Sequence, residues 1–151
     1  MKVDVEERVK LGVELMKSGY NCSQSVVAAF ADVYGLDRGT ALRVASSFGG
    51  GIGKMRLTCG AASGMFILAG LDNGSATAGD NKARTANYRL VQQLAQRFKE
   101  VTGSITCGEL LGLKPAYGDD GKQINCTKLP CVELVALACR IFAEHLNSKS
   151  E

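Results

Sequence analysis

The chain has 151 residues, and its 18 Lys and Arg residues against 15 Asp and Glu residues give a formal net charge of +3. A chain of this length buries roughly 68 to 70% of its unfolded surface, so its core needs neither disulfides nor a metal to form. The small positive charge is mixed with acidic residues, which argues against a surface for nucleic acid or anionic lipids. We therefore expect one domain over residues 1–151, with no nucleic-acid or membrane partner.

The N-terminal segment, MKVDVEERVKLGVELMKSG, lacks the unbroken apolar core of a secretory signal. The longest apolar stretch, residues 64–71, is far shorter than the ~18 residues that a membrane-spanning helix requires. We therefore expect a cytoplasmic protein. In a reducing cytoplasm, metal binding or redox chemistry explains six cysteines better than permanent disulfides do. These residues are Cys22, Cys59, Cys107, Cys126, Cys131 and Cys139.

Apolar residues recur mainly at spacings of three and four along the chain, while strict alternation is scarce. This pattern predicts an all-α fold, a single-domain helical bundle of about six to seven helices. A first helix is expected to end at Gly19 and a second at Gly35, because glycine commonly follows a helix. A third helix is expected across residues 41–48.

The stretch from Ala61 to Leu71 is apolar on all sides, which predicts a helix at the centre of the bundle. A glycine-rich link, residues 49–53, precedes it, and a polar loop at residues 72–80 follows. A long helix should then end at Gly103, before a short turn at Cys107–Leu111 and an irregular segment at residues 112–130. The last helix places five apolar side chains on one face: Val135, Ala138, Cys139, Phe142 and Leu146.

Four cysteines lie where helices are expected to begin. Asn or Thr, residue types that cap helix N-termini, precedes three of them, and a proline precedes the fourth. The four are Cys22, Cys59, Cys107 and Cys131, after Asn21, Thr58, Thr106 and Pro130. The free N–H groups and the dipole of a helix start favour a thiolate and lower its pKa. We predict that these four thiols are reactive; the alternative is that they pack as small hydrophobic residues.

Glycines before and after Cys59 allow the backbone to approach a ligand or a sulfur closely. Successive N–H groups in the link can form a nest for an anion, so we predict cofactor contacts from Gly51, Gly53, Gly60 and Gly64. A tight, irregular link between two helices is the alternative. Lys54 and Arg56 add positive potential near Cys59 unless they point to water, which makes Cys59 the predicted nucleophile.

The remaining cysteines and the single histidine are expected to play other roles. Cys139 lies on the apolar face of the last helix, which favours packing. Cys126 lies five residues before Cys131 and is a resolving thiol, an extra ligand or an incidental residue. His145 is interpreted as a surface or capping residue. No zinc-finger spacing, HExxH motif or cysteine-protease signature is present, so hydrolysis has no supporting constellation.

Five segments in chain order resemble the C-GCAxxG-C-C family over residues 19–146. They are YNCSQ at 20–24, FGGGIG at 48–53, TCGAASG at 58–64, GSITCGELLG at 103–112 and CVELV at 131–135. The resemblance matches the family's four cysteines to Cys22, Cys59, Cys107 and Cys131. It implies a helical, redox-active protein, and the family's selenocysteine-containing members imply chemistry at sulfur. The central motif reads Cys-Gly-Ala-x-x-Gly, with Thr58 where the family name places glycine.

Three functions remain open at this point. In the first, two of the four cysteines cycle between dithiol and disulfide, as in a thiol-based oxidoreductase, with a redox protein or a small oxidant or reductant as partner. In the second, Cys22, Cys59, Cys107 and Cys131 bind an iron-sulfur cluster or a zinc ion in an electron carrier or sensor. In the third, they fill space in a helical interaction module. A homodimer is compatible with each. Sulfur atoms close to one another would argue against the third function.

Overall fold

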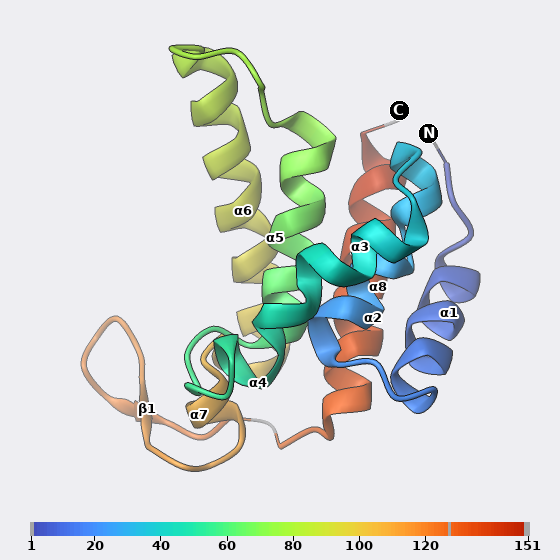
Figure 1. The fold of residues 1–151 in the computed structure, drawn as a ribbon. Helices are drawn as coiled ribbons and strands as arrows, with labels where there is room; N and C mark the ends of the chain where they lie inside the picture. Colours follow the sequence, from blue (N-terminus) through green and yellow to red (C-terminus); the bar gives the residue numbers. More distant parts are fainter. Residues whose placement is uncertain (1, 127, 150–151) are drawn as a thin grey trace.

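The computed structural model describes residues 2–126 and 128–149, which form helices and one small hairpin. The predicted all-α class is confirmed. The long helices are α1 (Val5–Lys17), α5 (Gly60–Asn73), α6 (Asn81–Thr102) and α8 (Cys131–Ser148) (Figure 1). The short helices are α2 (Cys22–Ala28), α3 (Arg38–Ala45), α4 (Gly49–Ile52) and α7 (Cys107–Leu110). Two 3-10 turns are η1 (Ala31–Tyr34) and η2 (Ser46–Phe48).

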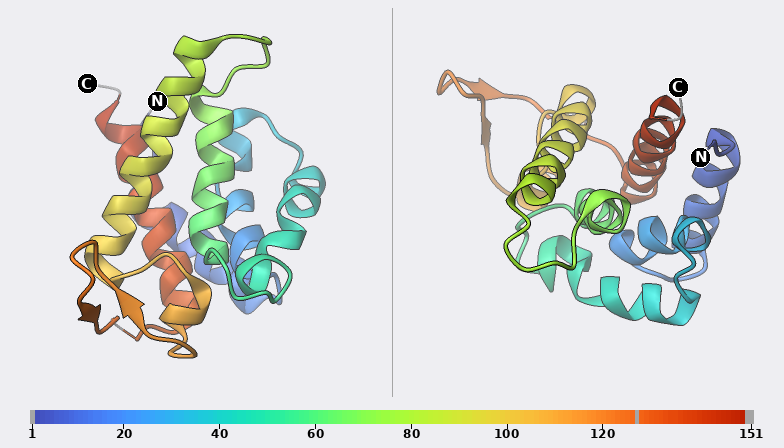
Figure 2. Two further views of the ribbon diagram at one scale, coloured as in Figure 1. Left: turned by 90° about the vertical axis from the view of Figure 1, so that its left-hand side faces the viewer. Right: turned by 90° about the horizontal axis from the view of Figure 1, so that it is seen from above.

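Helix α5 lies at the centre of the bundle, as its uniformly apolar sequence predicted, and it contacts α2, α6 and α8 (Figure 2). Its small residues allow this close packing: a Cβ atom placed on Gly64 would lie 2.8 Å from the Cβ of Val26. Phe30 and Phe142 are fully buried beside it, and their rings meet edge to face with centroids 5.1 Å apart. Within the described residues, no helix has both the length and the apolar character needed to cross a membrane.

Helix α1 packs along α8 at a glycine. A Cβ atom on Gly12 would lie 2.5 Å from the Sγ of Cys139, so the α8 cysteine rests directly on the α1 backbone. Cys139 is fully buried, as its position on the apolar face predicted, and burial raises its pKa to about 12. This thiol is therefore a packing group held in the neutral form.

Several element boundaries differ from those predicted. The second expected helix divides into α2 and η1, and the third divides into α3 and η2. The apolar spacing of the sequence predicts a stripe on α6 of Tyr88, Val91, Leu94, Ala95, Phe98 and Val101. Leu94 and Phe98 are buried as predicted, together with Leu90 and Thr102, whereas Tyr88 and Val101 are 59% and 49% exposed. Residues 112–130 include a hairpin of β1 (Ala116–Tyr117) and β2 (Gln123–Ile124), whose strands are too short to give an alternating pattern.

The direction of the helices is what positions the site. Helices α2, α5, α7 and α8 all begin at the end of the molecule drawn lowest in Figure 1, where the link through α4 also lies. Each of these four helices begins at or beside a cysteine. The fold therefore gathers at one end four segments that are separated by 24 to 48 positions in the chain, as the cysteine numbers show.

Candidate functional site

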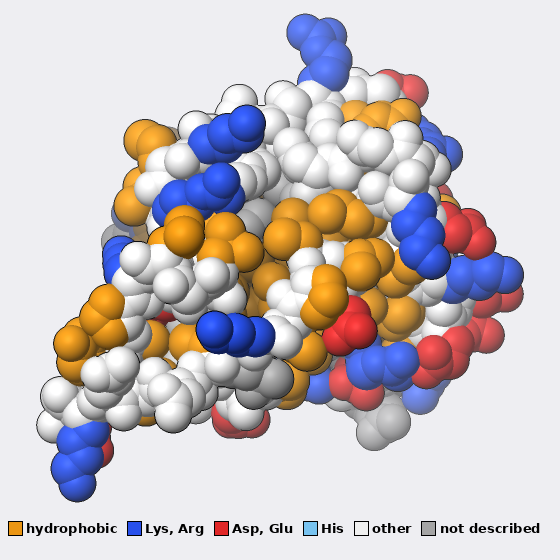
Figure 3. Space-filling view, turned by 90° about the horizontal axis from the view of Figure 1, so that it is seen from below, with side chains coloured by type: hydrophobic (Ala, Val, Ile, Leu, Met, Phe, Trp, Pro, Cys, Tyr) orange, Lys and Arg blue, Asp and Glu red, His pale blue; other side chains and the backbone are white. Residues whose placement is uncertain are grey.

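Four cysteines line a single small cavity at this end of the bundle. The cavity has a volume of about 60 Å³, enough for only a few water-sized molecules. Its lining consists of Cys22, Cys59, Cys107 and Cys131 with Gly50, Gly51, Arg56, Gly60, Leu110, Leu111 and Leu134. Figure 3 views the molecule from this end and shows hydrophobic side chains gathered across the middle of the face. The four thiols thus face a common, largely apolar space.

Two of these cysteines are held together by their own backbone. An antiparallel bridge joins Thr58 to Thr106, the residues that precede Cys59 and Cys107. The Cys59 N–H donates to the carbonyl of Ile105 at 2.6 Å, and the Cys107 N–H donates to the carbonyl of Leu57 at 2.5 Å. The two Thr-Cys-Gly segments therefore lie side by side, with Cys59 and Cys107 on the same face of the pairing.

Two of the four glycines that were predicted to contact a cofactor lie at the cavity. There they allow the segments that carry the cysteines to approach one another closely. A Cβ atom on Gly51 would lie 2.5 Å from the Cβ of Cys107, and one on Gly60 would lie 3.1 Å from the Cβ of Cys22. The other two glycines lie elsewhere: Gly53 is exposed, and Gly64 packs against α2. The structure therefore does not bring the four glycines to one ligand.

The glycine-rich link adopts an unusual left-handed path. Positive φ angles occur at Gly50, Gly51 and Gly53, and also at Ile52 (67°), Lys54 (65°) and Arg56 (61°), where a side chain makes them costly. The N–H groups of residues 53–57 each donate to a carbonyl within residues 47–52. The N–H groups of residues 53–57 are therefore engaged within the segment and are not available to an anion. The alternative interpretation, a tight irregular link, describes this segment.

Cys22 and Cys131 interact at the mouth of the cavity. The Cys22 thiol donates a hydrogen bond to the sulfur of Cys131; this bond raises the pKa of Cys22, and burial and the charges of Cys131 and Cys59 raise it further. The same hydrogen bond lowers the pKa of Cys131 to about 6, against the opposing effect of burial and with help from the charge of Arg56. The pair therefore loses its first proton well below the usual range for thiols.

Cys59, the predicted nucleophile, is not the thiol that ionises first. Its side chain is only 4% exposed, and burial raises its pKa more than the nearby N–H groups of Ala61 and Ala62 lower it. Neither predicted cation serves it: Lys54 is exposed, and Arg56 donates from Nη1 to the Sγ of Cys107 at 3.7 Å. The expectation that a helix start lowers the pKa is therefore wrong for Cys59, because desolvation outweighs the helix dipole.

Only one of the three predicted side-chain caps forms. Asn21 accepts from the Gln24 N–H, and Gln24 accepts from the Asn21 N–H, which completes a capping box beside Cys22. At α5 the N-cap is Cys59 itself rather than Thr58, and at α7 the Thr106 side chain makes no capping hydrogen bond. Cys59 and Cys107 still lie at helix starts, but they are held there by backbone pairing rather than by threonine caps.

Sequence reasoning missed the apolar lining of the cavity. Leu110 and Leu111 follow Cys107 by three and four positions, and Leu134 follows Cys131 by three. Residues at these spacings share a helix face, so each cysteine predicts its own apolar neighbour once a helix is assumed to begin there. That signal was present in the sequence for α7 and α8.

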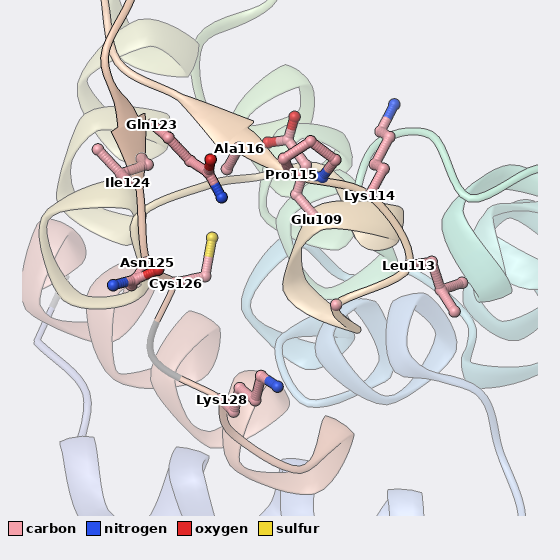
Figure 4. Close-up of a pocket in the computed structure, with 11 residues that line it drawn as sticks. Glu109, Leu113, Lys114, Pro115, Ala116, Gln123, Ile124, Asn125, Cys126 and Lys128 are labelled. Carbon is pink, nitrogen blue, oxygen red and sulfur yellow. The ribbon is translucent and has the colours of Figure 1, made fainter.

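Cys126 lies apart from the other cysteines. It lines a separate open pocket of about 520 Å³ between the hairpin and α7, together with Glu109, Lys114 and Lys128, and its sulfur points into that space (Figure 4). Burial raises its pKa, and the charge of Glu109 raises it further. Cys126 therefore does not face the thiols of the four-cysteine cavity.

His145, expected as a surface or capping residue, lies half-buried in the last turn of α8 at the opposite end, where its ring contacts Asp72. Its Nε2 lies 3.0 Å from Oδ2 of Asp72, whose side chain is only 5% exposed. The other oxygen of Asp72 accepts from the Tyr34 hydroxyl at 2.9 Å and from Lys149 Nζ at 2.7 Å. This Asp72 cluster joins η1, α5 and α8, and sequence periodicity does not reveal it because its members come from distant segments.

Across residues 2–126 and 128–149, no group of three or more His, Cys, Asp or Glu side chains is arranged to hold a metal ion. The four cavity cysteines have the chemistry of a metal site, but as they stand they are not placed around one point.

The comparisons with known proteins identify the chain's family. Neither the curated proteins nor the solved structures give a match. One family matches residues 20–145, which is most of the chain and includes all four cavity cysteines; its description is "Putative redox-active protein (C_GCAxxG_C_C)". The chain therefore belongs to the C_GCAxxG_C_C family of redox-active proteins.

Proposed function

We propose that this chain is a thiol–disulfide redox protein in which Cys131 is the attacking thiolate and Cys22 is the resolving thiol. The observation that carries the proposal is that Cys22 and Cys131 line one small cavity, where their interaction lowers the pKa of Cys131. A thiol becomes a nucleophile when its pKa lies below ambient pH, and a resolving thiol must be close enough to close the disulfide. Cys131 and Cys22 meet these two requirements.

The reaction is a disulfide exchange with an oxidised partner, R–S–S–R. The Cys131 thiolate attacks one sulfur, so that a Cys131–S–R bond forms and one RS⁻ leaves. The Cys22 sulfur, giving up its proton to the departing thiolate, then attacks Cys131 Sγ and releases the second RS⁻, which takes a proton from solvent. The two cysteines are oxidised and R–S–S–R is reduced to two RSH. A cytoplasmic reductant would restore the dithiol by the reverse exchange.

A Cys₄ iron-sulfur or zinc site is the competing function, because the same four thiolates would supply its ligands. We favour thiol exchange because the interaction with Cys22 lowers the pKa of Cys131, and because the described residues hold no group in metal-binding geometry. A purely packing role fits poorly, because cysteines that only fill space would not leave a cavity between them.

Oxidation of the reduced protein tests the proposal. With Cys126→Ser as the background, an added aromatic disulfide should release two aromatic thiolates rapidly, and peptide mapping should find Cys22 joined to Cys131. Adding Cys131→Ser should slow the reaction about thirtyfold or more at pH 7, because a thiol of ordinary pKa is only a few per cent ionised there. The matched control, Cys126→Ser alone, should react like the wild-type cavity.

Two results would contradict the proposal. An unchanged rate after Cys131→Ser would show that Cys131 is not the attacking thiolate. The absence of any disulfide in the oxidised protein would show that the cysteines do not undergo thiol–disulfide exchange. Anaerobic purification followed by metal analysis and a visible spectrum forms a separate arm. Stoichiometric iron or zinc held by the four cysteines would favour the competing function.

A further inference from the structure

The four cavity cysteines form two tiers that differ in access. Cys22 and Cys131 are partly exposed at the mouth, whereas Cys59 and Cys107 are only 4% and 9% exposed. A cavity of about 60 Å³ admits a few atoms, so a bulky disulfide can reach the outer tier and not the inner one. The inner thiols can therefore exchange with such a partner only through the outer pair.

Cys59 is the thiol through which the two tiers are connected. Its charge acts on Cys22, and the charges of Cys107 and Cys131 act on it in turn, so it lies within electrostatic reach of all three. Gly60, the next residue, would place a Cβ atom 3.1 Å from the Cβ of Cys22. On its other side, the Thr58–Thr106 bridge brings Cys107 alongside.

We propose that Cys59 and Cys107 form an internal dithiol that receives the disulfide made at Cys22 and Cys131, so that the cavity stores two disulfides in succession. This inference rests on the proposed function, because the outer pair must first be oxidised by a partner disulfide. It adds a second role to the cavity: after one transfer inward, the outer pair is reduced again and can accept a second oxidation.

The transfer balances in atoms and electrons. Cys59, on losing its proton, attacks the Cys22 sulfur of the outer disulfide; a Cys59–Cys22 bond forms and Cys131 leaves as its thiolate. Cys131 is the better leaving group because a thiol of lower pKa leaves faster. Cys107 then loses its proton and attacks Cys59, which forms the Cys59–Cys107 disulfide and releases Cys22. Of the two protons given up by the inner dithiol, Cys22 takes one and the other passes to solvent or to Cys131.

Formation of the Cys59–Cys107 disulfide requires these two cysteines to move slightly closer together. Cys59 and Cys107 are diagonal neighbours in the antiparallel pairing, a relation with a Cα separation of about 7 to 8 Å, whereas a disulfide needs about 4.4 to 6.8 Å. The two helix starts must therefore approach by about 1 Å. Gly60, just after Cys59, and Gly51, packed on Cys107, present no side chain that would block this approach.

Stoichiometric oxidation tests the inference. In reduced Cys126→Ser protein, five of the six cysteines remain, and the probe is dithiobis(nitrobenzoate), a bulky aromatic disulfide. We expect four aromatic thiolates to be released in two phases, with the Cys22–Cys131 disulfide mapped first and Cys59–Cys107 after it. Only Cys139 should remain free. The second phase should accelerate with rising pH, because burial keeps the Cys59 thiol protonated at neutral pH.

Two variants isolate the order of transfer. In Cys131→Ser/Cys126→Ser protein, oxidation of Cys59 and Cys107 should slow about thirtyfold or more, because only the slower reaction of Cys22 with the probe can start the transfer. In Cys107→Ser/Cys126→Ser protein, the transfer should stall as a Cys59–Cys22 disulfide that peptide mapping detects. Release of only two thiolates, with Cys22–Cys131 formed and Cys59 and Cys107 still free, would overturn the inference and leave the proposed function intact. Release of none would overturn the proposed function itself.

Discussion

Helices α5 and α8 run side by side in the same direction, and an anionic side chain has different partners at each end of this helix pair. At the shared start, Cys59 and Cys131 face a cavity, and the Cys131 sulfur has one thiol donor, Cys22. At the other end, Asp72 is enclosed by Tyr34, His145 and Lys149. Burial alone would raise the pKa of Asp72, but these hydrogen bonds hold it well below the usual range.

The Asp72 carboxylate stabilises the fold, whereas the Cys131 thiolate is free to react. Both oxygens of Asp72 have hydrogen-bond partners, and the Lys149 ammonium at the end of α8 also complements the dipole of that helix, so the Asp72 carboxylate is held in place. The Cys131 thiolate has a donor that is itself a thiol and can follow it into a covalent bond. The difference lies in the partner's chemistry: an ammonium, an imidazole and a phenol secure an anion, while a neighbouring thiol leaves it free to be oxidised.

The largest expected effect comes from filling the space around the cavity. Gly51→Ala would place a Cβ atom 2.5 Å from Cys107 Cβ and 2.8 Å from the backbone of residues 56 and 57, at a φ of +69°. We expect a loss of about 3 kcal/mol in the free energy of unfolding, from overpacking and left-handed strain together. Urea unfolding measures this loss, and thiol release in the surviving native protein should slow.

Gly53→Ala is the matched control for that prediction. Gly53 also has a positive φ, 57°, but a Cβ atom there meets only the carbonyl of Ser47, at 4.0 Å. We expect it to cost about 1 kcal/mol, the strain alone, with thiol exchange unchanged. Equal losses of unfolding free energy in the two variants would show that the close contact between Gly51 and Cys107 adds nothing to the cost of the substitution.

The Asp72 cluster provides the second prediction. Asp72→Asn keeps the shape of the side chain but removes the charge that His145 and Lys149 contact, so we expect a loss of about 2 kcal/mol in the free energy of unfolding. The cluster is far from the cavity, so the rate of thiol release should not change. A slower thiol reaction in folded Asp72→Asn protein would show that the two ends of α5 and α8 are coupled.

The same variant has a defined pH dependence. Because the pKa of Asp72 is lower in the folded protein than in the unfolded chain, its contribution is complete above the unfolded pKa of about 4 and is lost as the pH falls toward the folded value. The stability difference between wild type and Asp72→Asn should therefore narrow as the pH falls below about 4. A difference that stays constant in acid would mean that the Asp72 charge does not stabilise the fold.

The fold could be predicted from the sequence where the interactions that determine it are local. Helical periodicity and stop glycines placed the helices, and the apolar character of residues 61–71 placed α5 at the centre. The boundaries failed where one helix continues as a 3-10 turn, as α2 does into η1. The inward face of α6 was predicted correctly at Leu94 and Phe98 but not at Tyr88 and Val101, because the rotation of a helix depends on which neighbours it packs against.

The cavity could be predicted only in part from the sequence. The cysteines could be placed at helix starts from the residues around them, but which thiol ionises depends on burial, and burial at Cys59 is set by segments distant in the chain. The pairing of Thr58 with Thr106 spans too few residues to give a strand pattern. The left-handed path through Ile52 and Arg56 could not be predicted either, since such residues normally avoid it.

The smallest expected effect concerns Arg56, and it sharpens the contrast between the two ends. Cys22 is the main cause of the low Cys131 pKa and Arg56 is a lesser one, so Arg56→Gln should raise that pKa by about half a unit from its value of about 6. The thiolate fraction at pH 6 then falls about twofold. The midpoint of alkylation of Cys131 against pH measures this shift. Arg56→Lys keeps the positive charge and should leave the midpoint near its wild-type value. An equal shift in the two variants would assign the effect to the geometry of the guanidinium on Cys107 rather than to its charge. Thiolate formation at Cys131 would then depend mainly on its interaction with Cys22.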